Sequence, residues 1–319
     1  MNADPAKIEF ALRTADFDYD LPPEFIAQTP IEPRDASRLL VLDRRHDRLE
    51  HARFYELGKY LQAGDVLVLN QTRVIPARLY ARKIPSGGRV ELLLLRPQNE
   101  LTWEVLAGGK GLSVSKTVQV EGGPQAEIVA VLEGARRLVR FSERIEPYLD
   151  KVGHVPLPPY IHTPLADPER YQTVFAQQPG SAAAPTAGLH FTPRLLDALA
   201  EQGIQLVEIT LHVGLDTFAP VHEARPENHA VHTEWCQVSE SAAEMINRCS
   251  QQGGRVIAVG TTCVRSLETA AHALRRSGGT GRVQPYEGAT DLFILPGYEF
   301  LAVDGMVTNF HLPRSTLIM

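Results

Sequence analysis

The sequence predicts an α/β protein whose discontinuous main domain is interrupted by an inserted small antiparallel β-barrel. Short strands separated by turn residues fill positions 74–141, helices alternate with strands after Glu143, and a buried-type strand at Val66–Leu69 precedes both. The first 70 or so residues therefore group with the second half of the chain. The expected domains are a main domain of residues 1–73 and 143–319 and an insertion of residues 74–142.

Turn clusters define the insertion. They occur at Pro85-Ser86-Gly87-Gly88 and at Glu121-Gly122-Gly123-Pro124. Strands at this spacing favour a small antiparallel barrel or sandwich. The expected strands are Arg89–Arg96, Trp103–Ala107, Thr117–Val120, Ala126–Leu132 and Arg137–Phe141.

Capping signals predict the helices of the main domain. Thr192 before Pro193 favours a helix start, and Gly203 favours its end. Ser241 and Glu244 have the spacing of a capping box at the start of the next helix, which Gly253-Gly254 ends.

Short aliphatic runs predict the strands of the main sheet. Leu39–Leu42, Val66–Leu69 and Val256–Val259 are typical of buried parallel strands. A helix is expected after Gly260, with Val264, Leu267, Ala271 and Leu274 on one face. Val303-Asp304-Gly305-Met306 predicts a type I′ hairpin, after which Val307, Asn309 and His311 share one face of the returning strand.

Composition excludes several classes of protein. The chain has 319 residues, a hydrophobic fraction of 44% and a formal net charge of −6, so it is globular and does not coat nucleic acid non-specifically. Its three widely spaced cysteines fit neither a disulfide framework nor a zinc site. No secretory signal and no apolar run of about 20 residues are visible, so we expect a cytoplasmic protein without a membrane span.

The densest basic region offers two interpretations. Its arginines either contact phosphate or form a solvated face paired with nearby acids. They are Arg34, Arg38, Arg44, Arg45, Arg48 and Arg53.

Two histidines at the ends of predicted elements are candidates for chemistry. Alternation in Ile209–Gly214 puts Thr210 and His212 on one face, and ligands of α/β sheets bind beyond strand ends. The small residues of Ala183–Phe191 lead to His190 just before a helix N-terminus, where anions bind. A structural histidine and a tight packing corner are the respective alternatives.

Three further segments contain candidate residues. Thr261 and Thr262 open a helix and offer hydroxyls and amides to an anion or a ribose, whereas Arg265 and Glu268 have the spacing of a surface ion pair. Arg73 lies at the domain junction, where it either grips phosphate or carboxylate or forms an interdomain salt bridge.

The His229–Glu234 segment contains two histidines but lacks the pattern of a zinc site. The His-Glu-x-x-His order and a third ligand are both missing. A proton-transfer or orienting role for His232 is therefore favoured over metal binding.

Motifs in a fixed order extend over nearly the whole chain and resemble the S-adenosylmethionine:tRNA ribosyltransferase-isomerase family of queuosine biosynthesis. The motifs are Asp16–Pro22, Glu32–Asp35, Asn70–Arg78, Gly153–Ile161, Pro185–Phe191, Thr210–Phe218, Gly260–Glu268 and Thr308–Pro313. Two departures stand out. Asp216 occupies a position where the family usually has glycine, and the family usually continues for several tens of residues past Ser315–Met319.

The resemblance implies an activity and its partners. The ribosyl part of S-adenosylmethionine, a co-substrate, would be transferred to 7-aminomethyl-7-deazaguanine at the tRNA wobble position and isomerised, giving epoxyqueuosine, adenine and methionine. Neither a metal nor a prosthetic group is required, and a monomer is expected. The alternatives are an S-adenosylmethionine-dependent RNA methyltransferase, although the glycine-rich loop is missing, and a non-catalytic RNA-binding protein.

The resemblance and the segments above together give a set of expected site residues. The catalytic candidates are His190, His212 and His232. The expected substrate-binding residues are Arg73, Thr186, Gly188, Thr210, Gly214, Thr261, Thr262, Arg265, Glu268, Asn309 and His311.

Overall fold

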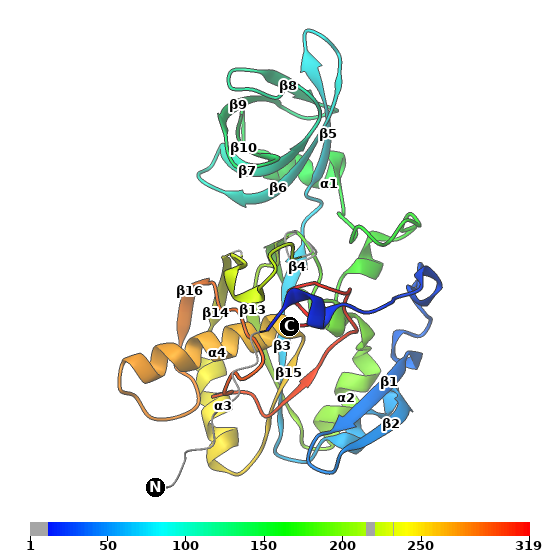
Figure 1. Cartoon of the computed structure of the whole chain (residues 1–319), viewed down its shortest axis with the longest axis vertical. Coiled ribbons are helices and arrows are strands. Elements are labelled where there is room, and N and C mark those ends of the chain that lie inside the picture. Colours follow the sequence, from blue (N-terminus) through cyan, green and yellow to red (C-terminus); the bar gives the residue numbers. More distant parts are fainter. Residues whose placement is uncertain (1–11, 215–220, 232) are drawn as a thin grey trace, which may run out of the picture.

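A β-barrel and a larger α/β domain make up the structure, which confirms the predicted fold class (Figure 1). The computed structural model describes residues 12–214, 221–231 and 233–319. The chain leaves the larger domain near β4 (Thr72–Val74) and enters the barrel, which stands above that domain in Figure 1. A short parallel pairing joins β4 to β12 (Gln178–Ser181).

Among the described residues, six antiparallel strands close the barrel in the order β5-β6-β7-β10-β9-β8. Closure follows because β5 pairs with both β6 and β8, which leaves the ring without an open edge. Five of the strands confirm the prediction, and β5 is the strand that was not predicted. The bounds are β5 (Arg78–Ile84), β6 (Arg89–Pro97), β7 (Thr102–Gly108), β8 (Thr117–Val120), β9 (Gln125–Val131) and β10 (Arg136–Phe141).

Alternating aliphatic residues fill the barrel. Leu79, Leu92 and Ile128 are fully buried in one hydrophobic cluster. The cluster extends past residue 142 to Ile145 and to Leu149, the first residue of α1 (Leu149–Val152). Next, β11 (Gly153–His154) pairs with β5, so the barrel sheet takes in chain beyond the expected boundary.

The larger domain is built on a sheet of six described strands in the order β16-β14-β13-β3-β15-β17. β13, β3, β15 and β17 are parallel, whereas β14 and β16 add an antiparallel edge. The bounds are β3 (Val66–Asn70), β13 (Gln205–Leu211), β14 (Glu234–Val238), β15 (Val256–Val259), β16 (Tyr286–Thr290) and β17 (Gly305–Val307).

Helices cover both faces of this sheet. Val66 and Val68 of the central strand β3 pack with α3 (Glu240–Gln251) and α4 (Thr261–Arg276). Leu67 and Leu69 pack on the other face with α2 (Pro193–Glu201) and the 3-10 helix η4 (Phe54–Tyr60). Burial on both faces explains why β3 is a continuous aliphatic run.

Of the two predicted N-terminal helix caps, the one at Thr192 is confirmed and the one at Ser241 is not. Thr192 caps α2 by accepting a hydrogen bond from the Leu195 N–H, and Gly203 after the helix has φ +82°, as predicted. The predicted cap Ser241 is wrong, because Ser239 caps α3 through the Ala242 N–H.

The expectation for Leu39–Leu42 is wrong. This segment lies in β1 (Arg38–Asp43), which forms an antiparallel hairpin with β2 (Arg48–Arg53) outside the main sheet. Asp43 stabilises the turn by accepting hydrogen bonds from the N–H groups of Arg45 and His46, so β1 pairs with its neighbour in sequence.

The predicted hairpin at Val303–Met306 is also wrong. The chain continues as β17, parallel to β15. Asp304 sets this register, because its N–H donates to the Val256 carbonyl and its carboxylate accepts from the Val256 N–H.

Cys236, Cys249 and Cys263 are free and buried, as expected. Burial raises the pKa of Cys236 to about 11 and that of Cys263 to about 12, so both are thiols at neutral pH. Within the described residues, no helix combines the length and the apolar character that a membrane span needs.

Candidate functional site

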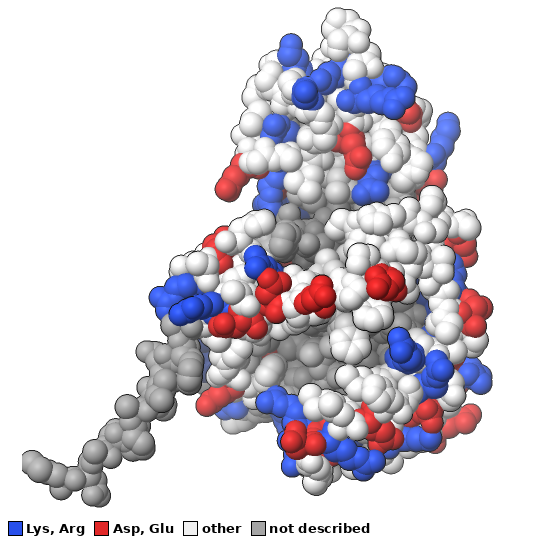
Figure 2. Space-filling model, turned by 45° about the vertical axis from the view of Figure 1, so that its right-hand side comes forward, with Lys and Arg blue, Asp and Glu red and all other residues white. Residues whose placement is uncertain are grey.

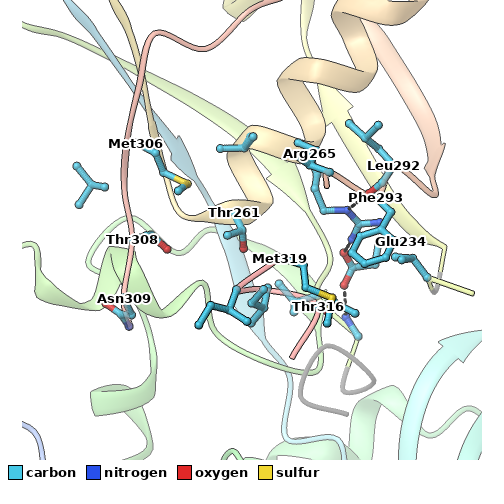
Figure 3. A pocket seen from close by; sticks show the side chains of 18 of the residues that line it. Glu234, Thr261, Arg265, Leu292, Phe293, Met306, Thr308, Asn309, Thr316 and Met319 are labelled. Carbon is cyan, nitrogen blue, oxygen red and sulfur yellow. Dashed lines mark hydrogen bonds and ion pairs between the residues drawn. The ribbon is translucent and has the colours of Figure 1, made fainter. Parts of the chain in front are cut away.

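A groove with a volume of about 2780 Å³ lies at the carboxyl ends of the parallel strands and reaches the barrel (Figures 2 and 3). His212 follows β13, Thr261 follows β15 and Asn309 follows β17, and all three line this groove. Ligands of α/β sheets bind at this edge. The volume exceeds the roughly 300–1,000 Å³ of a small-molecule pocket, so there is room for more than one ligand group.

Three contacts hold the imidazole of His212. Its Nδ1 lies 2.8 Å from the Thr72 hydroxyl oxygen. The ring stacks on Trp235, with centroids 5.2 Å apart and an interplanar angle of 18°. On Gly180, which has φ +146°, a Cβ would lie 2.8 Å from the ring. Burial lowers the pKa of His212, so the ring is neutral at pH 7 and able to accept a proton.

His190 borders the same groove. It ends the 3-10 helix η7 (Thr186–His190), and its Nε2 lies 3.1 Å from the Asn309 side-chain oxygen. Burial lowers the pKa of His190, while hydrogen bonds to Asn309 and to the backbone of Arg34 offset part of that lowering. His190 and His212 thus both line this groove.

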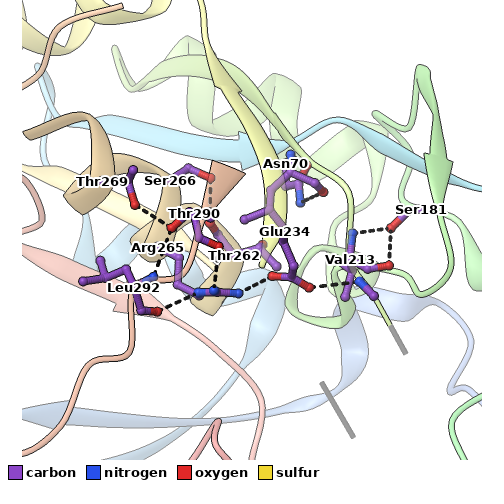
Figure 4. Close-up of polar contacts among 12 residues, drawn as sticks. Asn70, Ser181, Val213, Glu234, Thr262, Arg265, Ser266, Thr269, Thr290 and Leu292 are labelled. Carbon is purple, nitrogen blue, oxygen red and sulfur yellow. Dashed lines mark hydrogen bonds and ion pairs between the residues drawn. The ribbon is translucent and has the colours of Figure 1, made fainter. Parts of the chain in front are cut away.

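A buried ion pair between Arg265 and Glu234 forms the polar wall of the groove (Figures 3 and 4). The Arg265 guanidinium also donates to the carbonyls of Leu292 at 3.0 Å and Thr290 at 3.3 Å. Glu234 accepts a hydrogen bond from the Gly214 N–H at 2.9 Å. Arg265 thus pairs with Glu234 rather than with Glu268, and Glu234 links its guanidinium to the Gly214 amide at the groove wall.

Glu268 lies outside the groove lining and is fully buried. Its carboxylate accepts hydrogen bonds from the N–H groups of Leu301, Ala302 and Val303 at 2.9–3.1 Å and from the Tyr298 hydroxyl at 3.0 Å. This side chain ties α4 to the segment that leads into β17.

Gly214, Thr261, Arg265 and Asn309 join the two histidines in the groove lining. Elsewhere, Thr210 is buried and accepts from the Gln71 amide, and Arg73 forms an ion pair with Glu169. The close packing of Gly188 against Phe175 leaves no room for a Cβ. Thr186, Thr262 and His311 also lie outside the lining, whereas His232 and Asp216 are not among the described residues.

The interpretation of the His229–Glu234 segment as a metal site finds no support within the described part of the chain. No group of three or more His, Cys, Asp or Glu side chains there could hold a metal ion. His229 instead contacts the Glu223 carboxylate at 2.8 Å.

Four residues that shape the site were not predicted from the sequence. They are Thr72, Gly180, Glu234 and Trp235. Glu234 and Trp235 open β14, the strand between β16 and β13, and its pairing to β13 brings them beside His212. Glu234 lies in the His229–Glu234 segment, which was considered as a metal site from the sequence.

Comparisons with known proteins agree with one another. The family described as "Queuosine biosynthesis protein" matches residues 14–319. S-adenosylmethionine:tRNA ribosyltransferase-isomerases of Desulfitobacterium hafniense and Moorella thermoacetica are 50% and 51% identical, over 97% of this chain and 90% of each relative. A crystal structure of S-adenosylmethionine tRNA ribosyltransferase from Thermotoga maritima is 37% identical with a TM-score of 0.50, covering 95% of this chain and 87% of that one.

Proposed function

The chain belongs to the queuosine biosynthesis protein family, and from this membership we infer that it is an S-adenosylmethionine:tRNA ribosyltransferase-isomerase. The observation that carries the inference is that proteins of that name are 50% and 51% identical to this chain over 97% of its length. The enzyme transfers the ribosyl moiety of S-adenosylmethionine to the 7-aminomethyl-7-deazaguanine of the tRNA wobble position and isomerises it. Epoxyqueuosine is formed, and adenine and methionine leave.

We assign proton transfer to His190 and His212. The positive sulfur of S-adenosylmethionine acidifies the neighbouring ribose C5′–H, so a neutral imidazole is a sufficient base. Departure of adenine requires an acid, and an imidazole that has accepted a proton meets that need. Their position on one groove and their lowered pKa values support the assignment. His232 remains a lesser candidate for the same chemistry.

The groove-lining residues are the proposed ligand contacts. Arg265, Thr261 and the Gly214 segment would hold the methionine carboxylate or the ribose, and Asn309 would face the base, because they border the histidines. The remaining residues of the expected set would support this arrangement from outside: Arg73, Thr186, Gly188, Thr210, Thr262, Glu268 and His311.

The proposed substrate also suggests where and how the enzyme works. Because its substrate is tRNA, the enzyme is assigned to the cytoplasm. It is further proposed to act as a monomer, and its mass in solution, measured by light scattering, tests this assignment.

Incubation with S-adenosylmethionine and precursor tRNA tests the function. Chromatography should show free adenine, and mass analysis of the tRNA nucleosides should show epoxyqueuosine. A methylated nucleoside with S-adenosylhomocysteine would indicate a methyltransferase instead. Binding of tRNA without consumption of S-adenosylmethionine would indicate a non-catalytic RNA-binding protein.

A further inference from the structure

The barrel insertion has the opposite charge from the rest of the chain. Residues 74–142 contain ten Lys or Arg and six Asp or Glu, a net charge of +4. The whole chain has a net charge of −6, so the remainder carries −10. Lys and Arg side chains are spread over the visible face of the barrel in Figure 2. A polyanion would therefore meet an attractive surface mainly on the barrel.

Four of these cations lie on two stretches that contain no acidic residue. Residues 83–90 include Lys83 and Arg89, and residues 105–118 include Lys110 and Lys116. The first stretch contains the β5–β6 turn and the second contains the β7–β8 loop. In Figure 1 the β5–β6 turn points away from the larger domain.

Contacts between the two stretches bring the four cations onto one rim of the barrel. The Lys83 ammonium donates to the Lys110 carbonyl. A Cβ on Gly109 would lie 3.3 Å from the Arg89 carbonyl oxygen, so these backbones touch. Pairing of Ile84 with Thr117 places Lys116 beside the same turn. We call Lys83, Arg89, Lys110 and Lys116 the basic rim.

The acidic residues nearest to the basic rim are already paired. Glu91 binds Arg78 and Glu121 binds Arg82, each at 3.0 Å, and Glu127 binds Arg140 at 2.8 Å. Arg89, Lys110 and Lys116 are exposed, and within the described residues they have no carboxylate partner. Their charges are therefore available to an external anion.

We propose that the basic rim binds the phosphate backbone of the tRNA at a distance from the reacting base. Phosphate contacts fix position without reading sequence, and their strength depends on the number of free cations. Glycine and serine in both loops let the backbone of an RNA strand approach closely. The inference rests on the proposed function, since it takes tRNA as the substrate.

A triple variant tests the proposal: Arg89→Gln, Lys110→Gln and Lys116→Gln. Lys83 is kept, because its contact with Lys110 supports the loop. The matched control, Arg248→Gln, Arg275→Gln and Arg276→Gln, removes the same charge from exposed positions of α3 and α4. Thermal unfolding verifies that both variants fold.

The rim variant should raise the Kd and KM for tRNA by roughly tenfold or more. It should also reduce the slope of log Kd against log salt concentration by about 2 to 3. Both kcat at saturating tRNA and the KM for S-adenosylmethionine should stay unchanged. Wild-type affinity and salt slope in the rim variant, or an equal loss in the control, would overturn the proposal. Failure of the wild-type protein to release adenine would refute the proposed function instead, and tRNA binding would still report on the rim.

Discussion

The imidazole of His212 is held through one ring nitrogen and by stacking on an aromatic ring. Thr72 engages Nδ1, Trp235 covers one face and the Gly180 backbone lies against the ring. Among the described residues Nε2 has no hydrogen-bond partner, so Nε2 is the nitrogen offered to the groove. Fixing the ring before the substrate arrives is how a catalytic imidazole is oriented.

Replacing Thr72 with valine should slow the reaction without unfolding the protein. The change keeps the branched shape but removes the hydroxyl that orients His212, a loss of about 1 kcal/mol or roughly fivefold in kcat. Thr72→Ser restores the hydroxyl and should recover most of the rate. Steady-state kinetics checks both variants, and equal rates for the valine and serine variants would contradict the orienting role.

Gly180→Ala should impair catalysis more than Thr72→Val. The added Cβ would lie 2.8 Å from the His212 ring, and φ +146° is unfavourable for alanine. The ring must shift, so we expect kcat to fall by about tenfold or more. The control is Gly278→Ala, at another positive-φ glycine where a Cβ has no neighbour within 4 Å. If both alanine variants lose the same activity, the effect comes from backbone strain and not from displacement of the ring.

Alanine at His190 or His212 should cut turnover by about two to four orders of magnitude. Burial holds the pKa of both imidazoles below 6.5, and the neutral form is the base. The wild-type kcat/KM should therefore be constant near pH 7 and fall only as the pH drops below the usual histidine range. His51→Gln, at an exposed histidine outside the groove lining, is the control. If kcat/KM already began to fall above pH 7 as the pH was lowered, a neutral imidazole with a lowered pKa would be excluded as the base.

At the scale of elements, local sequence patterns predicted those strands that depend on the burial of their own side chains. Barrel strands β6 to β10 and the strand β15 were found because alternation and aliphatic runs report burial directly. β17 was misjudged because its pairing depends on Asp304, whose partner Val256 is 48 residues away. The position of His212 at the groove followed from the strand-end rule, whereas Thr72 lies 140 residues from His212 and left no local signal.

Glu268 links two elements, and removing its carboxylate should loosen that link. Glu268→Ala would leave one buried and two part-buried N–H groups without their acceptor, so we expect a loss of about 2–5 kcal/mol in the free energy of unfolding. Urea unfolding measures this loss. Glu268→Gln keeps one carbonyl acceptor and should lose less. An alanine variant as stable as the wild type would show that the 298–303 segment does not depend on Glu268.

On the scale of the whole molecule, the barrel and the main sheet have separate hydrophobic cores. Leu92 lies in the barrel cluster, whereas Val68 belongs to the cluster between the main sheet and α3 and α4. Each core is closed by its own strands, so the two units should open as separate cooperative units. Stability in one unit should therefore change without an equal change in the other.

Leu92→Ala should destabilise the barrel alone, by about 2–5 kcal/mol, because the side chain is fully buried and leaves a cavity. Hydrogen exchange followed by mass spectrometry should show faster exchange in β5 to β10 and unchanged exchange in β3 and β15. Val68→Ala is the reciprocal variant, and it should accelerate exchange in the main sheet. Because the proposed phosphate contacts lie on the barrel and the proposed chemistry lies on the main sheet, mild destabilisation by Leu92→Ala should weaken tRNA binding more than it lowers kcat. Uniform acceleration of exchange across both units would instead show that the chain unfolds as one cooperative unit.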